Sequence, residues 1–303
     1  MSYDPDALLD RRRLKRRLRI WQAVTVLVVV GAALLFLEGR GALLQGDRVA
    51  RIHIDGVIVS DEARSRTLAR LADDDGIRAV IVHIDSPGGS VVGGEDLYNG
   101  LRAIAETKPV ASVMGTVATS AAYMTAIATD RIFAREGSIT GSIGVILQSA
   151  NVTELLDKVG VEPVTIKSSE LKGVPSPVEP LTPEGRAVTE SVVLDLYDFF
   201  VDLVKKRRPI DVEAVRRLAD GRVFSGRQAV ENGLIDAIGD EANAIDWMVR
   251  ERDLPAGLPI ETVRTSRDEN TLLDKITELS GKSLFSNALT LDGLISLWQP
   301  SAS

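Results

Sequence analysis

The sequence contains no cysteine, and only two of its 303 residues are histidine. The absence of cysteine excludes a thiol nucleophile, a disulfide framework and thiolate zinc sites. No pair of histidines and no cluster of carboxylates has the spacing of metal ligands, so we expect neither a metal nor another cofactor. With so few histidines, a neutral lysine is the best candidate for the base that a hydroxyl nucleophile needs.

Charge is distributed unevenly along the chain. The formal net charge is −7, yet residues 11–19 (RRRLKRRLR) carry seven basic side chains. The basic residues are therefore concentrated in one short stretch that precedes an acidic body, which argues against nucleic acid as a partner. Hydrophobic residues make up 45% of the chain and charged residues 26%, as in a globular protein with a substantial core.

One apolar stretch, residues 20–37 (IWQAVTVLVVVGAALLFL), contains no charged residue. As a helix it would span roughly 27 Å, which matches the hydrocarbon core of a bilayer. The arginines before it predict a cytoplasmic N-terminus, with residues 38–303 on the periplasmic or extracellular side of a bacterial-type inner membrane. The alternative is a cleaved signal peptide, but the following residues FLEGRGALLQGD match an A-x-A cleavage site poorly.

The remaining sequence alternates between short apolar runs and helical patterns, which predicts an α/β architecture with mainly parallel strands. Strands are expected at 49–54, 57–59, 77–84, 109–113, 131–134 and 162–166. Helices are expected at 62–73, 91–106, 120–128, 151–159, 183–207, 211–219, 226–232 and 240–252, with one or two amphipathic helices over 271–298. The predicted organisation is a basic tail (1–19), an anchor (20–37), a linker (38–47), a catalytic domain (48–254) and a C-terminal amphipathic tail (255–303).

The segment 85–90 (DSPGGS) directly follows the apolar strand 77–84 and precedes the helix 91–106. We expect a strand-to-helix turn there, in which Gly88 and Gly89 let the backbone approach a ligand closely. Free N–H groups in such a place have the geometry of an oxyanion hole. The alternative interpretation of these glycines alone is an ordinary tight turn.

Ser120 lies between a strand that ends near Val113 and an alanine-rich stretch that favours helix. At the start of that helix, the local dipole favours developing negative charge on the serine. The alternative is that Thr119 or Ser120 is simply an N-cap.

Lys172 lies 52 positions after Ser120, in a loop-like segment with apolar neighbours and two prolines. A lysine acts as a general base only where burial lowers the pKa of its amine toward neutrality. The apolar neighbours could dehydrate such an amine. Lys167 is a rival for this role, and an ordinary solvated loop lysine is the alternative for either residue.

Four segments occur in one order along the chain: DSPGGSV (85–91), MGTVATSAAYMTAIATDRIFA (114–134), TGSIGV (140–145) and IKSSELKGVPSP (166–177). In these motifs the chain resembles the signal peptide peptidase A (protease IV) family of membrane-anchored serine peptidases, over about residues 48–252 and the anchor. The resemblance implies a ClpP/crotonase-like fold. It also implies an endopeptidase that degrades hydrophobic peptides such as cleaved signal peptides, within a homo-oligomeric assembly at the membrane.

By the same resemblance, Ser120 is the nucleophile and Lys172 the general base. The oxyanion donor is the backbone of Gly89, with Gly88 beside it, and Ser142 orients the lysine. One departure concerns Ala121 and Ala122, where family members often have two glycines. Their methyl groups are expected to narrow the space beside the hydroxyl.

Three other functions compete with this interpretation. A Ser-His-Asp triad would need His53 or His83, but both lie in apolar strand patterns and neither follows Ser120 in the sequence. A CoA-binding enzyme of the crotonase fold would not need Lys172 or an anchor. A non-catalytic membrane scaffold built on a peptidase fold is the third alternative.

Overall fold

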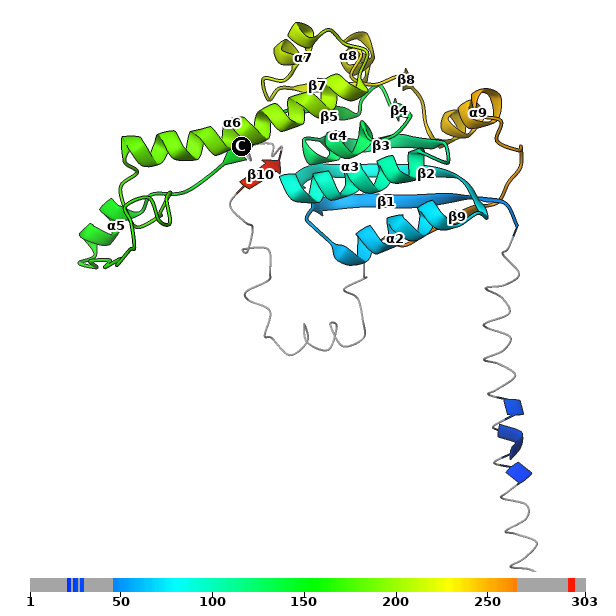
Figure 1. Ribbon diagram of the computed structural model, residues 1–303, viewed down its shortest axis with the longest axis horizontal. Coiled ribbons are helices and arrows are strands. Elements are labelled where there is room, and N and C mark those ends of the chain that lie inside the picture. The colour runs from blue at the N-terminus through cyan, green and yellow to red at the C-terminus, as the bar shows by residue number, and fades with distance from the viewer. Residues whose placement is uncertain (1–20, 23, 27, 30–45, 266–293, 298–303) are drawn as a thin grey trace, which may run out of the picture. The chain divides into compact units, whose positions relative to one another are not determined.

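The computed structural model (Figure 1) describes residues 21–22, 24–26, 28–29, 46–265 and, for the backbone, 294–297. The chain divides into two units, Met1–Asp47 and Arg48–Ser303. In the first unit, the described residues between 21 and 29 are helical.

Most of the N-terminal predictions concern residues that the structure does not describe. The predicted tail 1–19, most of the predicted anchor 20–37 and most of the linker 38–47 lie outside the described residues. Among the residues that are described, no helix combines the length and the apolar character that a membrane span requires.

The second unit is a mixed α/β structure around a sheet of 10 strands within the described residues. Four parallel strands form its centre and run in the order β1, β2, β3, β4. Their bounds are Arg48–Ile58, Ile77–Ser90, Val110–Thr119 and Arg131–Ala134. β8 (Ala237–Ile238) extends the sheet beyond β4, and β9 (Ile260–Thr262) extends it beyond β1, both in parallel. The predicted α/β class is confirmed.

Four short strands surround the carboxyl ends of β2 and β3. β5 (Ile139–Gly141) pairs in parallel with the end of β3, and β7 (Val223–Ser225) pairs antiparallel with β5. β10 (Leu294–Leu297) pairs antiparallel with the end of β2 and with β6 (Ile146–Leu147). The sheet is therefore parallel in its centre and mixed only where these ends meet.

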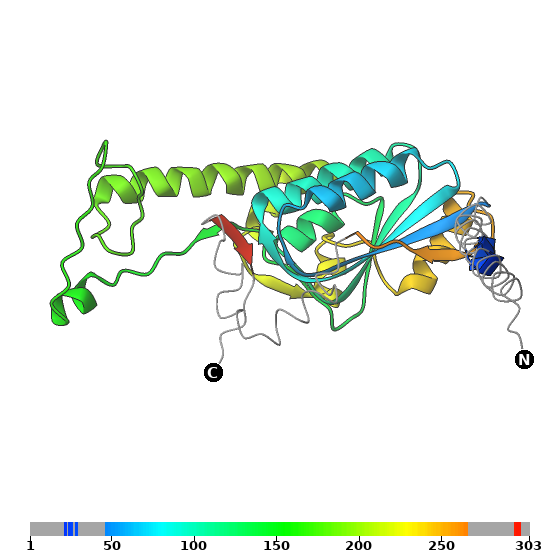
Figure 2. The same cartoon turned by 90° about the horizontal axis from the view of Figure 1, so that it is seen from below.

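Helices cover both faces of the sheet, because the central strands are apolar on both faces. Alternate residues such as Ala50, Ile52 and Ile54 face a core shared with α2 (Glu62–Asp73), α3 (Val91–Ala105) and α4 (Ala121–Ala126). Val49, Ala79 and Ile81 face a second core beneath α9 (Glu241–Glu251). Figure 2 shows α2 and α3 on one side of the sheet and α9 on the other.

A long helix, α6 (Pro183–Arg207), begins as its sequence predicts. Thr182 caps it by accepting a hydrogen bond from the N–H of Gly185, with Pro183 in the first turn. Its C-terminal half is packed on the body through Phe200, Val201 and Val204. We call residues 148–194 the arm, because they extend away from the sheet in both Figure 1 and Figure 2. The arm contains α5 (Thr153–Lys158) and the N-terminal half of α6.

Outside residues 85–90, two predictions of secondary structure are wrong. Residues 162–166 form no strand and lie exposed in the arm, with Val164 at 82% and Ile166 at 94% of full exposure. Their β-branched pattern is typical of a strand, but no partner strand lies beside them in the described chain. The predicted helix 271–298 ends in a strand at 294–297, because two strand edges there offer backbone partners; residues 271–293 lie outside the described residues.

The remaining helices and short strands complete the body. α7 (Val212–Leu218) and α8 (Gly226–Glu231) follow α6 at nearly the predicted positions. The strands β5 to β10 were not expected, and each is only two to four residues long. β9 lies within the predicted C-terminal tail 255–303 but is part of the sheet.

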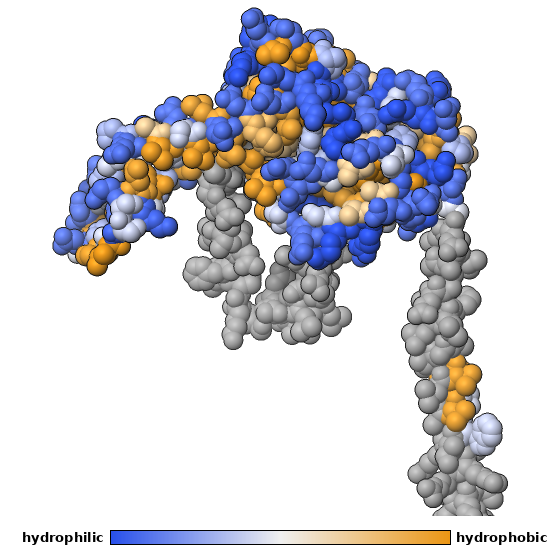
Figure 3. All heavy atoms as spheres, viewed as in Figure 1, coloured by the Kyte–Doolittle hydropathy of each residue, from blue (hydrophilic) through white to orange (hydrophobic). Residues whose placement is uncertain are grey.

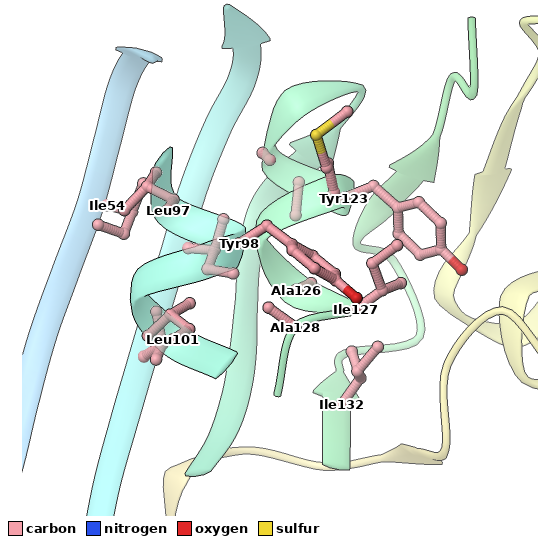
Figure 4. Close-up of a cluster of buried hydrophobic side chains, with 14 of the residues drawn as sticks. Ile54, Leu97, Tyr98, Leu101, Tyr123, Ala126, Ile127, Ala128 and Ile132 are labelled. Atoms are coloured by element: carbon pink, nitrogen blue, oxygen red, sulfur yellow. The ribbon is translucent and has the colours of Figure 1, made fainter. Parts of the chain in front are cut away.

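The core between α3 and α4 contains two buried tyrosines with different surroundings (Figure 4). The hydroxyl of Tyr123 donates a hydrogen bond of 2.8 Å to the carbonyl oxygen of Leu234, which ties α4 to the segment before β8. Burial raises the pKa of the Tyr123 hydroxyl, so it remains a neutral donor. Tyr98, on α3, makes no side-chain hydrogen bond with a described residue.

Removal of the Tyr123 hydroxyl should therefore destabilise the fold more than removal of the Tyr98 hydroxyl. We expect Tyr123→Phe to lower the free energy of unfolding by about 1–3 kcal/mol, because the buried carbonyl of Leu234 loses its partner. Tyr98→Phe is the matched control and should change it by about 0.5 kcal/mol or less. Urea denaturation followed by circular dichroism measures both, and equal losses would contradict the assigned role.

Candidate active site

The segment 85–90, which contains Gly88 and Gly89 and which we call the glycine motif, forms a strand and not the turn that the sequence predicts. β2 continues through Ser90, and its end pairs with β1, with Val57 opposite Gly88 and Ile58 opposite Gly89. A Cβ atom on Gly89 would lie 1.7 Å from the carbonyl oxygen of Ile58, so this close pairing requires glycine. Gly88 has a φ of +111°, which glycine adopts without strain.

Ser120 stands at the start of α4, as the sequence predicts, but β3 continues to Thr119 instead of ending near Val113. It is 1% exposed and has a φ of +59°, a conformation that non-glycine residues rarely adopt. Its backbone N–H donates to the carbonyl oxygen of Gly141 at 2.8 Å. Its side chain makes no capping hydrogen bond with α4, so the simple N-cap interpretation does not describe its hydroxyl. Strain of this kind is concentrated at functional sites.

The hydroxyl of Thr119 links the serine to the glycine motif. It donates a hydrogen bond of 3.0 Å to the carbonyl oxygen of Pro87, and Ala118 pairs with Ser86 in the sheet. Thr119, which directly precedes Ser120, is thus hydrogen-bonded to Pro87, which directly precedes Gly88 and Gly89. The N–H of Gly88 donates to Ser86 Oγ at 3.1 Å and is engaged within β2.

Ser142 follows Gly141, the residue whose carbonyl accepts from Ser120. It has a φ of +51° and is buried, and its N–H donates to the carbonyl oxygen of Arg222 at 2.8 Å. Ser142 lines a groove of about 600 Å³ between the β5–β6 segment and α6. Apolar side chains dominate the rest of this groove, among them Ile143, Val145, Leu194 and Tyr197.

Within one chain, the structure does not bring Lys172 to Ser120. Lys172 lies in the arm between α5 and α6, where it is exposed, and its amine makes no hydrogen bond or ion pair with a described residue. The rival Lys167 is ion-paired with Glu179, and this hydrogen bond holds the pKa of the Glu179 carboxyl below its usual range. Of the two lysines, Lys172 is therefore the one whose amine is not engaged by a carboxylate.

The two alanines after the serine fit the core. Ala121 and Ala122 are fully buried, and the methyl group of Ala121 lies against Gly94 of α3, where an added Cβ would be only 3.1 Å away. The space that Ala121 needs is thus supplied by the missing side chain of Gly94. The extra methyl group is accommodated on the side of α3.

The two histidines are far from forming a triad. His53 and His83 pair across β1 and β2, and their rings stack at 5.1 Å on the face that α9 covers, opposite to α4. His83 Nε2 is 2.5 Å from the carboxylate of Glu241. The hydrogen bond from Arg51 keeps the pKa of Glu241 below its usual range, against the opposing effect of burial. Neither histidine is hydrogen-bonded to Ser120, so the described residues offer no Ser-His pair.

Comparison with known proteins identifies the family. The model of peptidase family S49 matches residues 102–255, about half of the chain. A putative protease of Synechocystis sp. is 35% identical over 76% of this chain and 83% of its own length. A putative signal peptide peptidase SppA of Enterococcus faecium is 35% identical over 77% of this chain and 67% of its own length. The chain belongs to peptidase family S49. The predicted family is confirmed, and membership makes the chain a hydrolase of the serine peptidase class.

Further matches concern parts of the chain or of the relative. The model of the Clp protease family matches residues 48–140, which contain β1 to β4 and the serine. The chloroplastic serine protease SPPA of Arabidopsis thaliana is 34% identical over 72% of this chain but only 32% of its own length. Among solved structures, a ClpP1 variant of Listeria monocytogenes covers 69% of this chain and 99% of its own, at 14% identity and a TM-score of 0.45.

Three features of the site around Ser120 were not evident from the sequence of this peptidase. The hydrogen bond from Thr119, the carbonyl of Gly141 and the pairing of β10 with β2 all join segments far apart in the chain. Of these three features, only the one that involves Thr119 had a signal in the sequence, because Thr119 directly precedes the candidate nucleophile. Among the described residues, no group of three or more His, Asp or Glu side chains is arranged to hold a metal ion.

We expect Thr119 to act as a positioning residue for Ser120, and Thr119→Val should separate its effect on turnover from its effect on binding. The substitution removes the bond to Pro87, so we expect kcat to fall about tenfold to hundredfold with little change in KM. Thr119→Ser retains a hydroxyl and should recover most of kcat.

The matched control for this loss is Thr140→Val. Thr140 is also buried, and its hydroxyl donates 2.7 Å to the carbonyl oxygen of Ala118 without contacting the glycine motif. Steady-state kinetics with a fluorogenic peptide measure all three variants. Equal losses of kcat in Thr119→Val and Thr140→Val would mean that Thr119 acts only through stability.

Proposed function

We propose that this S49 peptidase is a membrane-anchored endopeptidase that hydrolyses hydrophobic peptides, such as cleaved signal peptides, with a Ser120/Lys172 dyad. The observation that carries the proposal is the backbone of Ser120. The serine has a φ of +59° at the end of β3. The preceding residue, Thr119, is hydrogen-bonded to Pro87 of the glycine motif. A serine on a strained turn between strand and helix is the arrangement of a nucleophile in hydrolases.

The proposed reaction is acyl transfer through Ser120. The neutral amine of Lys172 accepts the proton of the hydroxyl while Oγ attacks the peptide carbonyl carbon. The backbone N–H of Gly89 stabilises the resulting oxyanion, since the N–H of Gly88 is already engaged by Ser86. Lys172 then gives the proton to the leaving amine, and a water molecule deprotonated by the same lysine hydrolyses the acyl-enzyme.

Lys172 reaches Ser120 from a second copy of the chain in this proposal. The amine is exposed on an arm that extends away from its own sheet, and no carboxylate in the described part of the chain binds it. Burial in the groove of another copy would dehydrate the amine, which is the condition for a neutral lysine. Ser142 lines that groove and would be within reach to accept or donate a hydrogen bond that orients the amine. The peptidase is accordingly a homo-oligomer.

The surface of the arm supports both the assembly and the substrate class. Hydrophobic residues are exposed along the arm and its junction with the body (Figure 3). They include Leu155, Val159, Val164, Ile166, Val188, Val192 and Leu194. Exposed apolar residues gathered on one segment are typical of an interaction site. The anchor expected at residues 20–37 would hold the site near the inner membrane, with the catalytic domain on its periplasmic or extracellular side, where signal peptides remain after secretion.

Ser120→Ala tests the nucleophile and the alternative of a non-catalytic scaffold. Turnover of a fluorogenic hydrophobic peptide by the full chain in detergent should fall by at least about 10³-fold, because the proposed acyl-enzyme forms on the Oγ atom that this substitution removes. Thr140→Val, which leaves the serine in place, is the control for indirect effects on the core. Undiminished turnover by Ser120→Ala would exclude this nucleophile, and no turnover by the wild type would favour the scaffold.

Mixed assemblies test whether the dyad forms between copies. Ser120→Ala and Lys172→Ala should each be inactive alone, yet their co-expression at equal amounts should restore about a quarter of the wild-type sites if each site combines two neighbouring copies. A Lys167→Ala variant should remain active and serves as the control for the rival lysine. If the mixture stays inactive while each variant assembles normally by light scattering, the serine and lysine must come from one chain.

A further inference from the structure

β2 and β3, which lie side by side in Figure 1, change register shortly before the serine. The pair of Ile84 with Met114 is followed directly by the pair of Ser86 with Ala118. Between these two pairs β2 has one residue, whereas β3 has three, residues 115–117, which we call the β3 bulge. Bulges are frequent beside active sites, where they redirect the side chains that follow them.

The one residue of β2 at this level is Asp85, and its carboxylate is bound to the β3 bulge. The Oδ1 atom of Asp85 accepts a hydrogen bond of 3.1 Å from the backbone N–H of Val117. On the other side, the carbonyl oxygen of Gly115 accepts a hydrogen bond of 2.7 Å from Ser138 Oγ. A bulge interrupts the ladder of backbone hydrogen bonds, so its polar groups need other partners. Side chains from two other segments supply them here.

Gly115 provides the space in which this carboxylate lies. A Cβ atom on Gly115 would be 2.7 Å from Oδ2 and 2.8 Å from Cγ of Asp85, which is too close for either atom. The φ of Gly115 lies outside the left-handed region, so its backbone conformation does not require glycine. The absence of a side chain at this position is therefore explained by the approach of Asp85.

The β3 bulge is joined to the nucleophile by a short piece of backbone. Val117 is two residues before Thr119 and three before Ser120. Thr119 is itself hydrogen-bonded to Pro87, which lies two residues after Asp85 on β2. The glycine motif thus binds β3 at two places, once at the bulge and once at the residue before the serine. Both contacts constrain where β3 ends relative to the backbone of the glycine motif.

We propose that Asp85 is a positioning residue for Ser120, which acts through the β3 bulge. This proposal rests on the proposed function, because it takes Ser120 as the nucleophile. By holding the N–H of Val117, the carboxylate fixes the path of β3 and keeps Ser120 Oγ in place beside the N–H of Gly89. A displacement of about 1 Å at such a position can lower turnover by about a hundredfold.

Asp55 is the matched control for the charge of Asp85. The two residues are directly opposite each other on β1 and β2, and both are exposed. The carboxylate of Asp55 makes no hydrogen bond or ion pair with a described residue. A substitution of Asp55 therefore removes the same charge from the same place without changing the bulge. An effect of charge would be shared by both positions, whereas an effect of the hydrogen bond belongs to Asp85 alone.

Steady-state kinetics of the full chain in detergent separate these two effects. With a fluorogenic hydrophobic peptide, Asp85→Ala should lower kcat about tenfold to hundredfold with little change in KM. Asp85→Asn keeps an oxygen that can accept from Val117, so its kcat should stay within about threefold of the wild type, as should that of Asp55→Ala. Equal losses in Asp85→Ala and Asp55→Ala, or a kcat of Asp85→Asn as low as that of Asp85→Ala, would overturn the proposal.

Gly115→Ala tests the same contact from the side of β3. Its added methyl group would meet the carboxylate, so we expect kcat to fall about tenfold. Most of that clash is absent when Asp85 is alanine, so the two losses should not multiply. The double variant Asp85→Ala/Gly115→Ala should be within about threefold of Asp85→Ala. Losses that multiply fully would show that the two residues act independently, against the proposal.

Amide hydrogen exchange follows the bulge without any need for hydrolysis. By mass spectrometry of the full chain, peptides that cover residues 114–120 should exchange about tenfold faster in Asp85→Ala than in the wild type, and Asp55→Ala should not differ from the wild type. Unchanged exchange in Asp85→Ala would overturn the proposal. Faster exchange in a chain whose Ser120→Ala variant retains full turnover would support the placing of Ser120 by Asp85 and contradict the proposed function.

Circular dichroism shows whether each variant is folded before these measurements. If Asp85→Ala is unfolded, Asp85→Ser, whose side chain is one bond shorter than that of aspartate, replaces it in every assay. If Asp85→Ser is unfolded as well, Asp85 is needed for the fold as a whole, and the proposal of a positioning role is overturned.

Discussion

The pairing of β2 with β1 along one edge and with β3 along the other determines the geometry of the site. β1 accompanies β2 to Gly89, where the strands approach so closely that only glycine fits opposite Ile58. β3 ends earlier, and the hydroxyl of Thr119 fastens its last residue to Pro87. This difference in length between two parallel neighbours places a strained serine beside a stretch of the edge of β2 that β3 leaves unpaired. The catalytic role proposed for Ser120 and Gly89 depends on it.

The arm is the second structural feature that needs an explanation. A helix as long as α6 is ordinarily covered along one apolar face, but Val188, Val192 and Leu194 are exposed while Phe200 and Val204 are buried. The same region carries Lys172, whose amine is bound by no carboxylate among the described residues. An exposed apolar surface and an unengaged candidate base in one segment have a common explanation if both are buried against a second copy of the chain.

The sequence predicted the helices and central strands well, because capping residues and apolar periods are local signals. α2, α6 and β4 have the predicted bounds, as Thr182 and Pro183 illustrate for α6. It failed where the structure depends on distant partners. The glycine motif stays in the strand because β1 and β10 pair with it, and 162–166 stays unpaired because no strand adjoins it. The positions of Ser120 and Gly89 were foreseeable from their motifs, whereas the bond from Thr119 and the place of Lys172 relative to the serine were not.

The place of Lys172 has a consequence for where the proposed peptidase would act. The arm extends away from the sheet that carries Ser120, so the proposed dyad forms only when a second copy supplies the amine. Assembly of this kind depends on the concentration of the chain. The anchor proposed for residues 20–37 would raise that concentration, because it would confine the copies to one membrane layer. The proposed substrates are left in the same layer, so the anchor would bring the assembled site and its substrates together.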